Sequence, residues 1–181
     1  MEIVKVCEQL VKEIYEKMDA SHDFQHIERV FMNAEAILRT EPAANEKIVH
    51  LAVLLHDVSD SKYAADKSEE DRILKELHLE DSEVSHIKAV IAEVSFNGGN
   101  ELEATSIEAK IVRDADRLDA IGAVGIARTF AYGGVKGRKL YDDAEEACGD
   151  MSLEEYRSKS TASVTHFYEK LLLLKELMVT E

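Results

Sequence analysis

The sequence is poor in several residue types: it has one proline, two cysteines and no tryptophan in 181 residues. Two cysteines, Cys7 and Cys148, are too few for a disulfide framework, and because they form no Cys-x-x-Cys pair they also exclude a zinc-thiolate site. No apolar run reaches the length of about 18 residues that a membrane span needs, and residues 2–18 form an amphipathic pattern rather than a secretory signal. We therefore expect a cytoplasmic protein without a membrane as a partner.

Basic residues are also scarce. The 22 Lys and Arg side chains stand against 37 Asp and Glu side chains, so the formal net charge is −15 at pH 7. Such a charge repels the phosphates of a nucleic-acid polymer, which we exclude as a partner. Hydrophobic residues make up 45% of the chain, as is ordinary for a folded protein, and the length predicts a single domain over residues 1–181.

Helical periodicity dominates the rest of the pattern. Apolar residues recur at intervals of three and four, and only Pro42 forbids an interior helical hydrogen bond, so the predicted fold class is all-α. Candidate capping boxes that begin with Ser68, Thr105 and Ser152 mark three helix starts. The predicted helices cover residues 2–18, 23–40, 45–58, 69–78, 82–95, 106–130 with a candidate break near Gly122, and 153–178.

Polar residues in apolar surroundings are the first sign of function. The dipeptide His56-Asp57 follows the apolar run 51–55, and His26 lies on the apolar side of its helix. Taken singly, each of these residues is typical of a helix cap or a hydrogen-bonded surface group. Their common occurrence beside predicted core residues favours a shared role instead.

A third polar group occurs in the segment 111–121, where Asp114, Asp116 and Asp119 alternate with apolar residues. Asp116 is flanked by apolar residues one turn away on either side, and a buried carboxylate needs a cation. Two imidazoles and two carboxylates would give a mixed nitrogen and oxygen shell that suits Mn²⁺, Fe²⁺, Ni²⁺, Zn²⁺ or Mg²⁺. Four protein ligands leave two positions open on an octahedral ion, which favours catalysis over a purely structural site.

The order of His26, His56-Asp57 and Asp116 resembles the H…HD…D signature of the HD-domain metal-dependent phosphohydrolases. The resemblance is to the small bacterial and archaeal HD hydrolases and extends from about residue 20 to the end of the chain. The blocks that carry it lie at 22–30, 54–63, 114–123, 127–134 and 166–175.

This resemblance implies a helical bundle with a metal-site core over about residues 20–130 and a C-terminal helix at about 153–178. It implies that His26, His56, Asp57 and Asp116 bind one divalent ion, among Mn²⁺, Ni²⁺, Co²⁺, Fe²⁺, Zn²⁺ and Mg²⁺. It also implies a phosphate ester or anhydride as the substrate, with a nucleotide as the favoured class, since some members resemble nucleoside triphosphate pyrophosphohydrolases.

The expected reaction is attack on phosphorus by hydroxide bound to the metal that Asp57 helps to hold, because a divalent ion lowers the pKa of bound water to roughly 7. We expect Asp60 and His22 to handle protons. The candidates for neutralising substrate phosphate are Lys62, Arg117, Lys136 and Arg138, the last two in the glycine-bearing basic segment 133–139.

Other features of the sequence favour packing or leave alternatives open. His166 and Lys170 lie one turn apart on the last predicted helix and could reach a phosphate, but the apolar residues of this helix assign it chiefly to the core. A catalytically silent metal-binding helical interaction protein is one alternative function. A di-iron oxygenase on the same scaffold is another, but it would need further histidine ligands. The sequence leaves the oligomeric state open, a homo-oligomer included.

Overall fold

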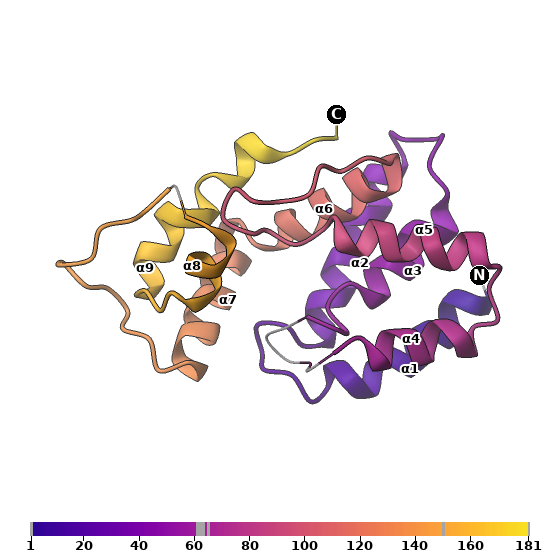
Figure 1. Ribbon diagram of the computed structural model, residues 1–181, viewed down its shortest axis with the longest axis horizontal. Coiled ribbons are helices and arrows are strands. Elements are labelled where there is room, and N and C mark those ends of the chain that lie inside the picture. Colours follow the sequence, from indigo (N-terminus) through magenta and orange to yellow (C-terminus); the bar gives the residue numbers. More distant parts are fainter. Residues whose placement is uncertain (1, 61–63, 65, 150, 181) are drawn as a thin grey trace.

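The computed structural model describes residues 2–60, 64, 66–149 and 151–180. It confirms the all-α prediction, since no strand occurs among these residues, and none of their helices is long and apolar enough to cross a membrane. The helices are α1 (Glu2–Tyr15), α2 (Phe24–Leu38), α3 (Glu46–Leu55), α4 (Ser68–Glu76), α5 (Asp81–Ala92), α6 (Ile107–Asp119), α7 (Gly122–Val135), α8 (Leu153–Ser158) and α9 (Ser163–His166) (Figure 1).

Helix α3 is the centre of the core. Its residues from Ile48 to Leu55 are all buried, because α1, α2, α5 and α6 pack around it. A helix that is apolar on every side needs such a covering. The polar residues that follow it, His56 and Asp57, are therefore held at the end of a rigid and fully packed element.

Helix α6 lies between the two halves of the molecule. It packs most extensively against α2 and also contacts α3, α5 and α7 (Figure 1). The predicted helix 106–130 is in fact α6 and α7, separated at Ala120 and Ile121 by the break expected near Gly122, whose φ of +64° suits glycine. Consequently α7, α8 and α9 gather on the side of α6 away from α1 (Figure 1).

The prediction of one helix over 153–178 is wrong. The helix α8 ends at Ser158, and Lys159 is extended with φ −67° and ψ 134°. The chain resumes as α9 and continues as a π-helix, η1 (Phe167–Leu171), and a 3₁₀ turn, η2 (Leu174–Leu177). Long-range hydrogen bonds stabilise this break in the helix, for example the one that the Ala162 N–H donates to Glu145. The apolar period of the sequence contains no information about such bonds.

Two of the three predicted helix caps are shifted by one residue. Ser152 and Glu155 do form the predicted capping box of α8. The N-cap of α6 is Ser106 rather than Thr105, because the Thr105 hydroxyl donates to Glu93 instead. Ser68 is the first residue of α4 rather than its N-cap.

The last described residues run along α6. The buried carboxylate of Asp114 accepts hydrogen bonds from the backbone N–H groups of Val179 at 2.8 Å and Thr180 at 2.7 Å. Arg117, one turn further along α6, donates to the Leu177 carbonyl. Two charged residues of α6 therefore fasten the end of the chain.

Candidate metal centre and cavity

Four polar side chains meet where α2, α3 and α6 come together. His26 lies in the first turn of α2, His56 and Asp57 follow α3, and Asp116 lies in α6. The Nε2 atom of His26 is 3.4 Å from Asp57 and 3.6 Å from Asp116, and the Nε2 atom of His56 is 3.6 Å and 3.8 Å from the same carboxylates. The structure thus brings together two imidazoles and two carboxylates from three separate segments.

These separations suit ligands of a single ion. Ligand atoms about 2.1 Å from a metal lie about 3.0 Å apart in octahedral and about 3.4 Å apart in tetrahedral coordination. The Nε2 atoms of His26 and His56 are buried and have no hydrogen-bond partner among the described residues. Burying a polar atom without a hydrogen-bond partner costs free energy. A cation bound between the two Nε2 atoms and the two carboxylates explains this arrangement better than packing does.

The other ring nitrogen of each histidine is already engaged. His26 Nδ1 lies 2.8 Å from Asp119, and His56 Nδ1 lies 2.8 Å from the Val53 carbonyl oxygen. Both partners are acceptors, so each Nδ1 donates, and in the neutral ring each Nε2 has its lone pair directed to the centre. Metal-binding histidines are usually held in this way.

Neighbouring charges shift the pKa values of His56, Asp57 and Asp116. Burial alone would lower the pKa of His56, but the Asp57 and Asp116 carboxylates outweigh it and raise that pKa to about 9. Burial would raise the pKa values of Asp57 and Asp116, yet His56 and His26 hold both below their usual range. The buried Asp57 carboxylate and the partly buried Asp116 carboxylate thus favour a positive charge between them, which a proton or a divalent ion can supply.

A second group of three potential ligands, Glu35, Glu46 and His50, lies between α2 and α3. Its character differs from that of the first group. His50 Nε2 is already bound to Glu35, the His50 ring stacks on Phe31 with centroids 4.5 Å apart, and Glu46 is exposed. The pattern favours a surface ion pair, and the buried group remains the candidate metal centre.

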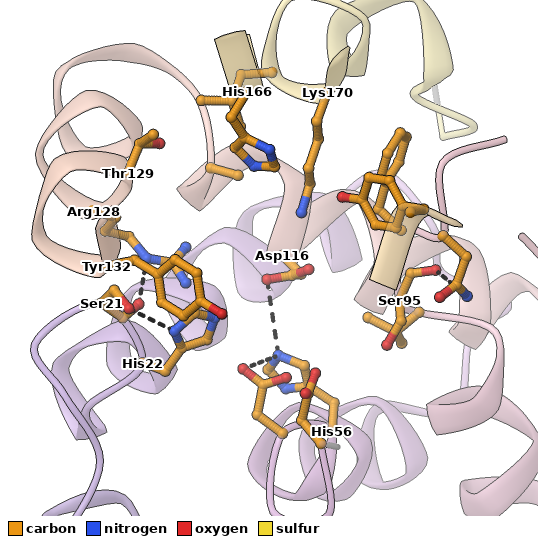
Figure 2. A pocket seen from close by; sticks show the side chains of 18 of the residues that line it. Ser21, His22, His56, Ser95, Asp116, Arg128, Thr129, Tyr132, His166 and Lys170 are labelled. Carbon is orange, nitrogen blue, oxygen red and sulfur yellow. Dashed lines mark hydrogen bonds and ion pairs between the residues drawn. The ribbon is translucent and has the colours of Figure 1, made fainter. Parts of the chain in front are cut away.

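The candidate centre opens into a cavity of about 820 Å³ between the two halves of the molecule. Figure 2 shows His56 and Asp116 on one side of this cavity, with His166 and Lys170 pointing toward them from the opposite side. Tyr132, from α7, lies beside His22. The elements beyond α6 therefore form one wall of the cavity and the metal-site core forms the other.

The sequence-predicted residues divide into three groups. His22, Asp60, Lys136 and Arg138 line the cavity, as do the candidate ligands His56, Asp57 and Asp116, whereas His26 lies behind them. Arg117 does not join them, because its side chain is buried against the Leu177 carbonyl. Lys62 lies outside the described residues.

Contacts with neighbouring side chains hold His22, a candidate for proton transfer, and Arg138, a candidate for phosphate binding, at the cavity. His22 Nδ1 is 2.7 Å from the Ser21 hydroxyl, which also contacts Asp19. The guanidinium carbon of Arg138 lies 5.2 Å from the centroid of the Tyr132 ring, so a cation–π contact holds it at the cavity.

Several residues that line the cavity or hold the candidate ligands in place were not assigned to the site from the sequence. His166 and Lys170, assigned chiefly to the core, line the cavity instead, because the interrupted helix turns them toward α6. Asp119 emerged only as one of three candidate aspartates, although its spacing of three from Asp116 places both on adjacent faces of α6. No feature of the sequence indicated a role for Arg128. It donates hydrogen bonds to the Ser21 carbonyl oxygen at 2.6 Å and to Asp119 at 2.9 Å.

Comparison with known proteins identifies similar sequences. The model of the HD domain family matches residues 23–121. The YpgQ protein of Bacillus subtilis is 35% identical over 190 residues, a match that covers all of this chain and 84% of YpgQ. The mimivirus protein L803 is 32% identical, over 84% of this chain and 75% of that protein.

Solved structures are similar over almost the whole chain. A Lactobacillus plantarum protein has a TM-score of 0.91 at 32% identity, covering 99% of this chain and 85% of that one. An HD-superfamily hydrolase from Bacillus thuringiensis has a TM-score of 0.70 at 41% identity, covering 99% and 84%. The complex of B. subtilis YpgQ with ADP has a TM-score of 0.75 at 32% identity, covering 99% and 82%.

Proposed function

The chain belongs to the HD domain family, and from this we propose that it is a divalent-metal-dependent phosphohydrolase that cleaves a phosphate ester or anhydride, with a nucleotide as its substrate. The observation that carries this proposal is the pair of buried Nε2 atoms that have no hydrogen-bond partner among the described residues and that face two carboxylates beside the cavity. The proposed ligands are His26, His56, Asp57 and Asp116.

A divalent ion held by these four residues would polarise a phosphoryl oxygen and lower the pKa of a water molecule. The remaining tasks fall to the chain itself. His22 and Asp60 line the cavity and are our candidates for accepting or supplying a proton. Lys136 and Arg138 lie in the same cavity and would offset the negative charge of the substrate phosphates.

Three observations support a nucleotide as the substrate. The cavity volume of about 820 Å³ falls in the range of roughly 300–1,000 Å³ that small-molecule and cofactor sites occupy. A structurally similar relative, YpgQ, has been crystallised in complex with ADP. A basic cavity wall in a chain with a net charge of −15 further favours an anionic ligand.

The test is metal reconstitution combined with a substrate screen. The protein is stripped with a chelator, reloaded with Mn²⁺, Mg²⁺, Ni²⁺ or Co²⁺, and assayed on nucleotides and phosphate esters for release of both phosphate and pyrophosphate. We expect hydrolysis only with metal. The variant His56→Ala should lose bound metal and activity together, because it removes a ligand.

His50→Ala is the matched control, since His50 is also a buried histidine of α3 but belongs to the second group, with Glu35 and Glu46. It should keep both metal and activity. Activity that persists in the presence of chelator, or a folded His56→Ala protein with its full metal content, would contradict the proposal. Metal binding without hydrolysis of any substrate would instead favour the catalytically silent alternative.

A further inference from the structure

We propose that Phe96 and Tyr156 form a nucleobase subsite at the end of the cavity, a surface that we call the aromatic corner. The inference rests on the proposed function, because it assigns the base of the nucleotide that the metal centre would hydrolyse. It adds a specific prediction about substrate class: the enzyme selects nucleoside polyphosphates over inorganic polyphosphates.

The aromatic corner consists of two rings from distant segments. Phe96 follows α5 and Tyr156 belongs to α8, and both line the cavity that contains His56 and Asp116. Their ring centroids are 5.6 Å apart with an interplanar angle of 70°. Both side chains are only partly buried, so each keeps some surface toward the cavity.

Two contacts hold the aromatic corner in place. The Asn100 side-chain amide donates to the Met151 carbonyl oxygen at 2.8 Å, which ties the loop after Phe96 to the start of α8. The Tyr156 ring packs directly over Gly98, where an added Cβ would lie 2.8 Å from ring carbons and φ is +65°. A side chain at position 98 would therefore displace Tyr156, and the glycine is required for the corner as observed.

The chemistry of the aromatic corner suits a flat heterocycle. A base that stacks on one of two nearly perpendicular rings presents its edge to the other, which combines the two favourable aromatic arrangements. An inorganic phosphate gains neither contact. Because every base has a π face, stacking of this kind gives affinity with little base selectivity.

A positive charge lies between the aromatic corner and the candidate metal centre. The ammonium nitrogen of Lys170 is 5.3 Å from the centroid of the Phe96 ring, and Figure 2 shows the same side chain extending toward Asp116. With the base at the corner and the reacting phosphate at the metal centre, the phosphates between them would face Lys170. The order of these groups thus follows the order of parts in a nucleotide.

The experiment compares ATP with inorganic tripolyphosphate, which has the same phosphate chain but no nucleoside. Wild type, Tyr156→Leu and Gly98→Ala are assayed after metal loading, with folding checked by circular dichroism. We expect both variants to lose about tenfold in kcat/KM for ATP, since stacking on an aromatic ring is worth about 1–3 kcal/mol per base. Their kcat/KM for tripolyphosphate should not change.

Binding supplies a readout independent of catalysis. Isothermal titration of chelator-treated protein with ADP and with inorganic pyrophosphate should show tighter binding of ADP to wild type, and both variants should lose that difference. Tyr141→Ala is the control, because Tyr141 is an exposed tyrosine that does not line the cavity. It should behave as wild type in both assays.

The outcomes separate the two proposals. If wild type hydrolyses none of the nucleotides and phosphate esters of the metal-reconstitution screen, the proposed function fails, while the comparison of ADP with pyrophosphate still decides the subsite. If the variants lower activity on both substrates equally, or leave the preference for ADP intact, the aromatic corner is not a base subsite.

Discussion

Asp119 should control metal affinity without touching the metal. Its buried carboxylate accepts hydrogen bonds from His26 Nδ1 at 2.8 Å, from Arg29 at 2.6 Å and 3.1 Å, and from Arg128 at 2.9 Å. Burial would raise the pKa of Asp119, but the hydrogen bonds from His26 and Arg29 lower it, so the group is ionised at neutral pH. An ionised acceptor fixes the tautomer of His26 and increases the basicity of its Nε2 atom.

The perturbation is Asp119→Asn, which keeps the shape of the side chain and removes its charge. The loss of such a supporting acceptor typically weakens metal affinity about 10- to 100-fold, or about 1.4 to 2.7 kcal/mol. Asp119→Ala should also destabilise the metal-free protein, because it leaves two guanidinium groups without their carboxylate. We expect a loss of about 3 kcal/mol, the lower end for a broken buried pair, since Arg29 is 32% exposed and can be resolvated.

Asp114→Asn is the matched control. Asp114 is an equally buried aspartate of the same helix, but its hydrogen bonds go to Val179 and Thr180 rather than to the metal centre. Competition titrations with a chromophoric chelator give the metal affinity of each variant, and thermal unfolding in chelator gives the stability. Equal metal affinity in Asp119→Asn and wild type, or an equal loss in Asp119→Asn and Asp114→Asn, would refute the argument that His26 is oriented through Asp119.

Three further predictions concern other parts of the chain. Arg138→Ala should raise the KM for a phosphorylated substrate with little effect on metal affinity, because Arg138 lines the cavity. Lys139→Ala removes the neighbouring exposed basic residue and should leave KM unchanged. Equal effects of the two substitutions on KM would argue against a role of Arg138 in the cavity. Arg117→Met should lower the melting temperature but not change KM, because this arginine fastens the chain end; a selective KM effect would restore it to the substrate site. Burial raises the pKa of the Cys7 thiol to about 12, whereas Cys148 is exposed. At pH 8 a thiol reagent should therefore modify only Cys148 in the native protein and both thiols after denaturation. Rapid labelling of Cys7 in the native protein would show that α1 does not stay packed.

The sequence by itself determined the features that depend on neighbours along one helix. The period of three and four, together with the candidate capping boxes, located α1 to α6, because the burial of one helix face repeats at that spacing. The same local logic singled out His26 and the dipeptide His56-Asp57, since polar residues embedded in apolar runs need a partner wherever the helix packs.

Only the tertiary structure decided the direction in which each polar side chain points. Arg117 lies in the last turn of α6 and Arg128 lies in α7, yet the first binds the Leu177 carbonyl oxygen and the second reaches Asp119. Sequence spacing does not distinguish them, because their partners lie on other elements. The link between His26 and Asp119 likewise spans 93 residues.

The wall of the cavity opposite the metal centre also belongs to the tertiary structure. The last predicted helix, 153–178, has a continuous apolar period, yet it is interrupted after Ser158 by contacts with the segment around Glu145. This interruption places Tyr156 beside Phe96 and turns Lys170 toward Asp116. Periodicity measures burial along a single helix, whereas long-range hydrogen bonds decide whether that helix continues, and so the cavity that would hold the substrate arises only when the distant segments pack together.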